Sequence, residues 1–185
     1  SPVQIGDADW SVVGAAGPGT AGGIKTDGTL WMWGNNATGQ LGQNAAGDNA
    51  QLSSPTQVGS DTTWSKLSVL SKGWGAIKTD GTLWVIGTNY GGALGLNQSG
   101  IDGYSSPVQL GSETTWDTMS FSYRTHLATK TDGTLWSWGY NHYGNLGHNN
   151  KHPVNYSSPT QIPGTEWYEI HTIANGNTCL AFKNV

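Results

Sequence analysis

Several residue types are scarce in this chain, and each scarcity excludes a class of protein. Only one cysteine, Cys179, occurs in 185 residues, so the chain cannot form a disulfide within itself. We expect Cys179 to behave as a small buried apolar side chain. Only 11% of the residues are charged, and the net charge is −4. No cluster of lysine and arginine is present to neutralise phosphates, so the composition argues against nucleic-acid partners.

Long apolar runs are lacking as well. No segment approaches the roughly 18–20 apolar residues of a membrane-spanning helix, so we expect no membrane insertion. No phosphate-binding motif precedes a predicted helix, and no cofactor is expected. What the chain has in abundance is 28 glycines and 10 tryptophans. That turn-rich, aromatic composition favours a folded β-protein and is not typical of disordered chains.

The most regular feature is a repeated heptapeptide, Lys-Thr-Asp-Gly-Thr-Leu-Trp. Its copies begin at Lys25, Lys78 and Lys130, 53 and 52 residues apart. A period near fifty indicates a propeller, a solenoid or another repeat array. We therefore expect one array over residues 1–185. Its predicted divisions are a partial repeat at 1–6, full repeats at about 7–59, 60–111 and 112–163, and a partial repeat at 164–185.

Each repeat predicts four antiparallel strands. The first begins at a tryptophan, the second runs into Lys-Thr, the third contains Thr-Leu-Trp, and the fourth follows Ser-Ser-Pro. Proline at the start of the fourth strand suits an outer edge, where a missing donor is tolerated. Nine residues of the heptapeptide are assigned structural roles in turns and packing: Asp27, Gly28, Trp31, Asp80, Gly81, Trp84, Asp132, Gly133 and Trp136.

The Asp-Gly pair between the second and third strands favours a two-residue type I′ turn. Such a turn would pair Ile24 with Trp31. Alternation along the strands would then place Ile24, Trp31 and Trp33 on one face, and Leu30 and Met32 on the other. Both faces are largely apolar, so we expect packed layers above and below each sheet.

The combined motif carries a resemblance to a known family. A tryptophan-led strand precedes Ile-Lys-Thr-Asp-Gly-Thr-Leu-Trp-x-Trp-Gly-x-Asn-x-x-Gly-Gln-Leu-Gly, and Ser-Ser-Pro-x-Gln follows. This order resembles the regulator of chromosome condensation repeat, in three full copies and two partial ones. The resemblance implies an all-β fold, a β-propeller of four-stranded antiparallel blades. About three and a half blades would belong to this chain, as an arc of a seven-bladed ring.

Departures from the repeat indicate where function is expected. The strand order places the first-to-second and third-to-fourth loops on one side, which is longer and more variable. Counting back four residues from the strand-two lysine gives Ala21, Trp74, His126 and Cys179, four different chemistries. The third long loop is rich in rings. The candidate binding residues are Trp74, Arg124, His126, Tyr140, His142, Tyr143, His148, His152 and Tyr156. The alternative is that these are ordinary solvated loop residues.

The sequence does not indicate metal binding or catalysis at these residues. The spacing of His142, His148 and His152 matches no standard metal site, and no cysteine lies nearby to complete a tetrahedral set. No catalytic group can be assembled from the sequence, because nothing ties its acids, hydroxyls and histidines together. We therefore expect neither a metal nor a catalytic residue.

The expected function is a non-catalytic extracellular or virion-associated module that presents variable loops on a rigid propeller. The Ser-Ser-Pro-x-Gln and Lys-Thr-Asp-Gly-Thr-Leu-Trp motifs of the repeats are similar to those of bacterial secreted and bacteriophage proteins. An alternative is a secreted inhibitor or regulator that binds another protein through one face; an enzyme is less favoured. The expected partners are other protein subunits or the remaining blades of a longer chain, and a cell-surface glycan is a further candidate. The family usually has Gly-x-x-His-Thr before the second strand, and the departure here weakens any transfer of a known function.

Overall fold

The computed structural model describes residues 4–7, 9–17, 19–98, 102–150, 154–172 and 179–183. Within them, antiparallel strands form three four-stranded sheets and one two-stranded sheet. The first sheet contains β1 (Trp10–Ala16), β2 (Thr20–Lys25), β3 (Leu30–Gly34) and β4 (Leu52–Gln57). The second contains β5 (Trp64–Leu70), β6 (Gly73–Lys78), β7 (Leu83–Thr88) and β8 (Gly103–Gln109). The third contains β9 (Trp116–Phe121), β10 (Thr125–Lys130), β11 (Leu135–Gly139) and β12 (Tyr156–Ile162).

The two-stranded sheet pairs β13 (Trp167–Thr172) with β14 (Cys179–Lys183). The only helical elements described are two three-residue 3-10 turns, η1 (Asp48–Ala50) and η2 (Tyr90–Gly92). In the described part of the chain no helix is long and apolar enough to cross a membrane. Of the predicted strand at residues 1–6, residues 1–3 lie outside the described part, and residues 4–6 form no strand.

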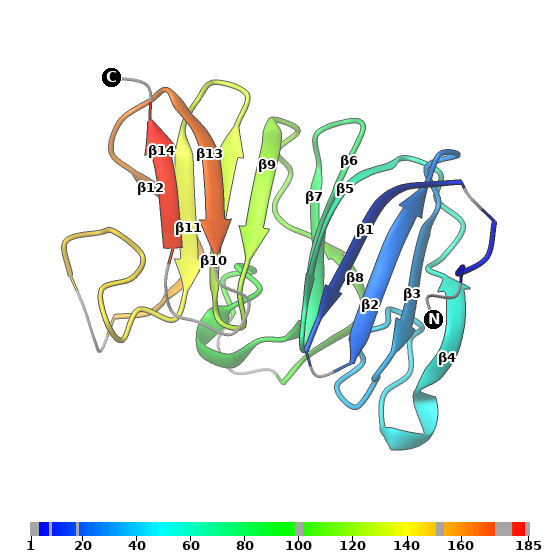
Figure 1. Ribbon diagram of the computed structural model, residues 1–185. Coiled ribbons are helices and arrows are strands. Elements are labelled where there is room, and N and C mark those ends of the chain that lie inside the picture. Colours follow the sequence, from blue (N-terminus) through cyan, green and yellow to red (C-terminus); the bar gives the residue numbers. More distant parts are fainter. Residues whose placement is uncertain are drawn as a thin grey trace.

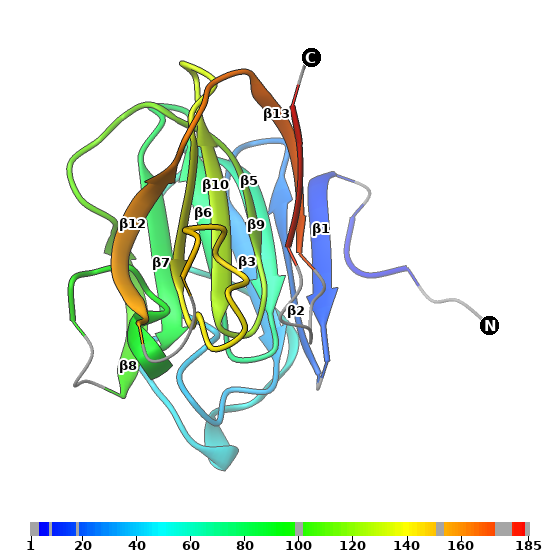
Figure 2. The same ribbon diagram turned by 90° about the vertical axis from the view of Figure 1, so that its left-hand side faces the viewer.

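The sheets are propeller blades arranged as an arc. The first strand of each blade contacts the first strand of the next, β1 with β5, β5 with β9 and β9 with β13. These strands therefore line the inside of the arc, while β4, β8 and β12 form its outer edges. Figure 1 shows the β1–β4 sheet, coloured blue to cyan, at one end and β13–β14 at the other, and Figure 2 shows β8 and β12 on the side opposite β1. The predicted edge position of the Ser-Ser-Pro strands is confirmed.

The predicted hairpin turn is wrong by one residue. Lys25 N donates to Thr29 O at 2.9 Å, and Gly28 N donates to Lys25 O at 2.9 Å. This is a three-residue loop, in which a type I turn is followed by a left-handed residue that forms a bulge. Gly28 has a φ of 79°, so the glycine alone takes the left-handed conformation at this turn. In consequence Ile24 faces Leu30, and the same shift occurs in the other two copies.

The corrected register separates two kinds of blade face. Ile24 lies with Leu30 and Met32 on an aliphatic face, and not with Trp31 and Trp33 as the type I′ turn would require. That aliphatic face packs against the tryptophan-bearing face of the next blade in one buried cluster. The cluster includes Ile24, Leu30 and Met32 from the first blade and Trp64, Trp74, Ala76 and Ile86 from the second.

The same arrangement recurs along the arc. A second buried cluster joins Ile77, Leu83 and Val85 to Trp116 and Trp138. A third joins Leu127 and Leu135 to Ile170, with Cys179 and Ala181 packed against them. Cys179 is partly buried, and burial raises the pKa of its thiol to about 11. Hydrophobic burial between blades, rather than within a single sheet, therefore holds the arc together.

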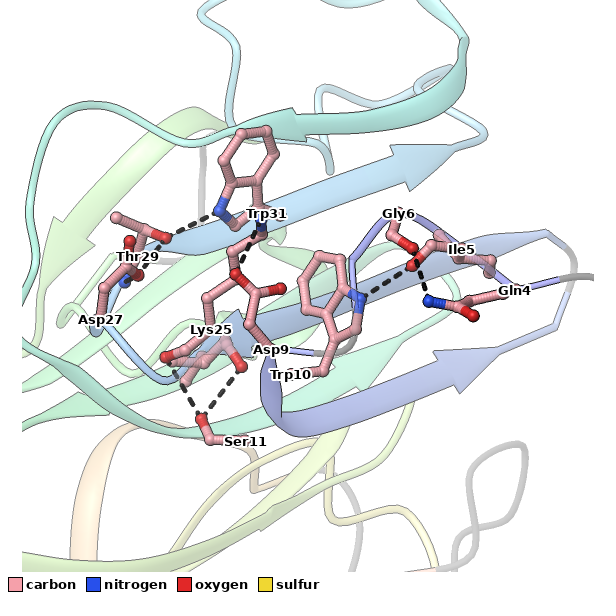
Figure 3. A network of polar contacts seen from close by, with 11 residues as sticks. Gln4, Ile5, Gly6, Asp9, Trp10, Ser11, Lys25, Asp27, Thr29 and Trp31 are labelled. Carbon is pink, nitrogen blue, oxygen red and sulfur yellow. Dashed lines mark hydrogen bonds and ion pairs between the residues drawn. The ribbon is translucent and has the colours of Figure 1, made fainter.

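The heptapeptide forms a continuous polar network at each turn. Asp27 Oδ1 accepts hydrogen bonds from Thr29 N at 3.0 Å and Thr29 Oγ1 at 2.6 Å, and Thr29 Oγ1 accepts from Trp31 Nε1 at 2.8 Å (Figure 3). The hydrogen bond from the Thr29 hydroxyl lowers the pKa of Asp27. Lys25 pairs with Asp9 at 3.2 Å. Asp80, Thr82 and Trp84 repeat this network, as do Asp132, Thr134 and Trp136.

Candidate functional site

The loops separate onto two sides of the arc, as the strand directions predicted. On one side, which we call the turn side, Asp-Gly turns bond to the connectors between blades; Trp64 N, for example, donates to Gly28 O at 3.1 Å. A Cβ on Gly28 would lie 2.1 Å from Thr62 O, so only glycine fits there. On the other side, which we call the variable side, the remaining loops meet. There Thr88 N donates to Lys72 O at 3.0 Å, and Tyr140 N donates to Arg124 O at 2.8 Å.

Each long loop on the variable side folds around one buried asparagine. In the first blade, Asn36 Oδ1 accepts from Leu41 N at 2.9 Å, and Asn36 Nδ2 donates to Ala45 O at 3.0 Å. Asn89 and Asn141 make the equivalent bonds in the second and third blades. All three asparagines are fully buried. The recurring Gly-x-Asn of the sequence is the signal for this anchor, and it was not given a role in the sequence analysis.

The loops are also fastened to the following blade. Asn44 N donates to Ser105 O at 2.9 Å, and Asn97 N donates to Ser157 O at 2.7 Å. Asn44 and Asn97 both have a φ of 56°, a left-handed conformation that asparagine tolerates. The variable side is therefore a set of differing side chains held on loops with fixed backbones.

Arg124 is the centre of a ring cluster on this side. Its guanidinium carbon lies 4.1 Å from the centre of the Tyr90 ring, 4.7 Å from that of Tyr123 and 5.6 Å from that of Tyr140. Such distances place a cation over aromatic faces, where the ring quadrupoles attract it. The Tyr90 and Tyr140 rings lie 6.2 Å apart. The cluster joins loops of the second and third blades.

The cluster continues outward through the third loop. The His142 ring stacks on Tyr140, with centres 5.6 Å apart and planes 9° from parallel. Tyr143 meets His142 edge-on at 4.7 Å. The side chain of Tyr143 is 69% exposed and that of Tyr90 is 57% exposed. Exposed rings beside a cation offer large contact area at a low cost in conformational entropy.

His148 and Tyr156 lie apart from this arrangement and have supporting contacts of their own. Ser137 Oγ donates to Leu146 O at 2.8 Å and accepts from His148 Nε2 at 2.9 Å. Burial lowers the pKa of His148. The His148 ring packs on Tyr156 at 4.6 Å. Both residues thus brace the loop. His152 lies outside the described residues.

Trp74 and His126 are not loop residues, which corrects their predicted placement. Both lie inside strands, Trp74 on β6 and His126 on β10, and their exposed fractions are 0% and 2%. Burial lowers the pKa of His126 to about 3. Opposite them on the neighbouring strands are Ile86 and Trp138, whereas Ala21 in the first blade faces Trp33. Differences at this equivalent position therefore reflect how each blade fills its interior, and a buried side chain offers no surface to a partner.

A pocket adjoins the Arg124 cluster, and sequence reasoning missed it. It has a volume of about 770 Å³ and opens between the loops of the first, second and third blades. Tyr90, Tyr104 and Tyr123 contribute rings to its wall, together with Lys72 and Asp102. Tyr90 replaces the alanine of the first repeat, just after the anchoring asparagine. That departure from the repeat is the signal in the sequence that could have indicated the site.

The described residues contain no group of three or more His, Cys, Asp or Glu side chains that could hold a metal ion. His142 and His148, two of the three histidines considered as ligands, contact different partners. Stacked rings, one guanidinium and a polar pocket on rigid loops are suited to contacts with another molecule.

Comparison with known proteins relates this geometry to a family. The model of the regulator of chromosome condensation (RCC1) repeat matches residues 27–69 and 132–182, which together make up just over half of the chain. The human protein RCC2 is 33% identical over 68% of this chain and 24% of its own length. The Arabidopsis thaliana ultraviolet-B receptor UVR8 is 29% identical over 80% of this chain and 33% of its own length. The chain thus spans a third or less of these curated relatives.

Solved structures agree at the level of the fold. Prp20p from Saccharomyces cerevisiae, described with its binding to Gsp1p and histones, aligns with a TM-score of 0.79 at 17% identity. The alignment covers 92% of this chain and 43% of Prp20p. Human WBSCR16 aligns with a TM-score of 0.75 at 21% identity, over 93% of this chain and 45% of that protein. Together with the repeat motif and the four-stranded blades, these matches show that the chain belongs to the RCC1 repeat family.

Proposed function

We propose that this chain is a non-catalytic interaction module that binds another protein through its variable side. The observation that supports this most directly is the contrast between its two sides. The turn side repeats the same heptapeptide network in each of the three four-stranded blades, whereas the variable side carries Arg124 with exposed rings on asparagine-anchored loops. Loops that differ on a fixed scaffold are a common place for recognition.

The relatives support a protein partner. A solved structure is described as Kap60 bound to yeast RCC1, and Prp20p is described by its binding to Gsp1p and histones. Those partners belong to the relatives. What we carry over to this chain is only that the partner is a protein. A secreted inhibitor or regulator would use the same face.

The proposed place of action is extracellular or on a virion. Its support is the composition alone, with 11% charged residues and a surface that relies on neutral polar groups. The relatives named above are from human, plant and yeast, and they lend this location no support.

Site-specific cross-linking in the native host tests the proposed face. A photoreactive phenylalanine at Tyr143 should capture a discrete protein, because this side chain is 69% exposed on the variable side. The same group at the exposed Ser112, on the turn side, is the matched control and should capture none. Capture at Tyr143 should weaken when Tyr90 is changed to Ser. Capture from Ser112 alone would place the working face on the turn side and contradict the proposal.

A further inference from the structure

Two cations on the variable side, Lys72 and Arg124, form no ion pair with a carboxylate of the described residues. Four lysines of the described chain form ion pairs with aspartate or glutamate, all of them away from this side. The Nε atom of Arg124 is buried and has no hydrogen-bond partner. Two unpaired cations on one face are a local exception in a chain of net charge −4.

Tyr123 brings these two cations together. Lys72 Nζ lies 5.7 Å from the centre of its ring, and the Arg124 guanidinium carbon lies 4.7 Å from it. A hydrogen bond from Arg124, followed by the charge of Lys72, lowers the pKa of the Tyr123 hydroxyl. The direction of that shift reports positive potential at this point. Lys72 and Tyr123 both line the pocket of about 770 Å³, so the positive potential reaches into it.

We propose that this pocket binds the carboxylate of an acidic segment in the protein partner, beside Lys72 and the Tyr123 hydroxyl, with Arg124 directly behind the Tyr123 ring. The proposal rests on the proposed function and deepens it by naming the chemistry of the partner. An arginine offers paired donors to a carboxylate, and its stacking on Tyr90 holds the guanidinium in place. The rings of Tyr90 and Tyr104 give the rest of the segment an amphipathic wall.

Asp102 also lines the pocket and offsets one of the two cations, which leaves about one net positive charge there. A single monoanionic carboxylate matches that charge, whereas a dianionic phosphate exceeds it. Because the chain as a whole is acidic, attraction to an acidic partner must come from these short-range contacts and should weaken as salt screens them.

Two peptides test this inference on the full chain. A fluorescein-labelled peptide of alternating glutamate and alanine should bind, as followed by fluorescence anisotropy. The same peptide with glutamine in place of glutamate should bind about tenfold more weakly or worse. Lys72→Ala and Arg124→Gln should each weaken the glutamate peptide by about tenfold. Lys66→Gln is the matched control, because Lys66 pairs with Asp117 away from the pocket, and it should leave the affinity unchanged.

The outcomes separate this inference from the proposed function. Thermal unfolding of each variant guards against misfolding, and Lys72→Ala alters an exposed side chain in any case. Equal affinity for the two peptides, or full affinity in Lys72→Ala, overturns the carboxylate pocket. Tighter binding of a phosphopeptide or of a hyaluronan fragment overturns it as well. If the cross-link from Tyr143 persists at full yield in Lys72→Ala, the carboxylate pocket is contradicted, while the proposed protein-binding face is supported. If the glutamate peptide binds while Tyr143 captures no protein, the pocket stands and the proposed function fails.

Discussion

Lys78 lies with its ammonium nitrogen 4.0 Å from the centre of the Trp84 ring. The same nitrogen lies 4.7 Å from the centre of the Trp64 ring on β5 and forms an ion pair with Asp61 Oδ2 at 2.7 Å. The Lys78 side chain is only 10% exposed. In the three four-stranded blades this lysine is thus a packed residue, because its stem covers tryptophan while its charge contacts rings and a carboxylate.

Replacing this lysine should destabilise the fold. Lys78→Met keeps the stem and removes the charge, so it loses the cation–ring contacts and the ion pair. We expect a loss of about 1–2 kcal/mol in the free energy of unfolding, measured with denaturant. Lys66→Met is the control, since Lys66 is 44% exposed in its pair with Asp117 and should lose less than about 1 kcal/mol. Equal losses would show that burial between the tryptophans adds nothing.

The threonine of the heptapeptide is the second test. Thr82 Oγ1 donates to Asp80 Oδ1 at 2.7 Å and accepts from Trp84 Nε1 at 2.9 Å. Thr82→Val keeps the shape of the side chain and removes both bonds. We expect a loss of about 1–2 kcal/mol in unfolding free energy, because the part-buried indole N–H is left without its acceptor. Thr79→Val, at an exposed position of the same turn, should change stability by less than about 0.5 kcal/mol.

The hairpin shows what the sequence could and could not predict. Its position, the strand order and the edge strands followed from the period, the prolines and Asp-Gly. The register did not, because Asp-Gly fits both a two-residue and a three-residue loop. The hydrogen bonds from Thr29 to Asp27 accompany the longer loop here. One residue of slip then moved Ile24 to the opposite face.

The site was harder to predict for a different reason. Trp74 stood out because it breaks the repeat, but its size is matched by Ile86 on the neighbouring strand. Which residue lies opposite a large side chain on the neighbouring strand depends on the strand register, and the sequence pattern did not determine that register. Tyr90 and Lys72 come from one repeat and Tyr123 from the next, and Tyr123 meets the other two only because neighbouring blades stand side by side. Single-repeat comparison cannot reveal such a meeting.

Trp74, which the sequence placed among the candidate binding residues, provides a third prediction. The fully buried Trp74 packs edge-on against Trp64, with ring centres 5.9 Å apart. Trp74→Ala should cost about 3–5 kcal/mol in unfolding free energy, through lost burial and the cavity left behind. Trp84→Ala should cost less, since Trp84 is only partly buried. Denaturant unfolding of the two variants compares them directly, and a larger loss for Trp84 would contradict the packing described for the first interface.

The pH dependence of stability provides the last test, through His126. This side chain is 2% exposed, with its ring 4.4 Å from Phe121 and 5.8 Å from Trp138. Burial lowers its pKa in the folded protein from 6.5 to about 3. Between these values the unfolded chain binds a proton that the folded protein excludes. The contribution is therefore fully present above pH 6.5 and is lost progressively as the pH falls toward about 3.

His126→Phe should flatten this dependence, because phenylalanine binds no proton. Between about pH 6.5 and pH 4.5 the natural protein should lose up to about 1.4 kcal/mol of unfolding free energy per pH unit from this residue. The variant should lose distinctly less over the same range, even if its overall stability differs. It keeps a smaller slope from His148, whose pKa burial also lowers. Parallel curves for the natural protein and His126→Phe would mean that His126 takes up a proton while still folded, and that its surroundings are wetter than the packing of Phe121 and Trp138 implies.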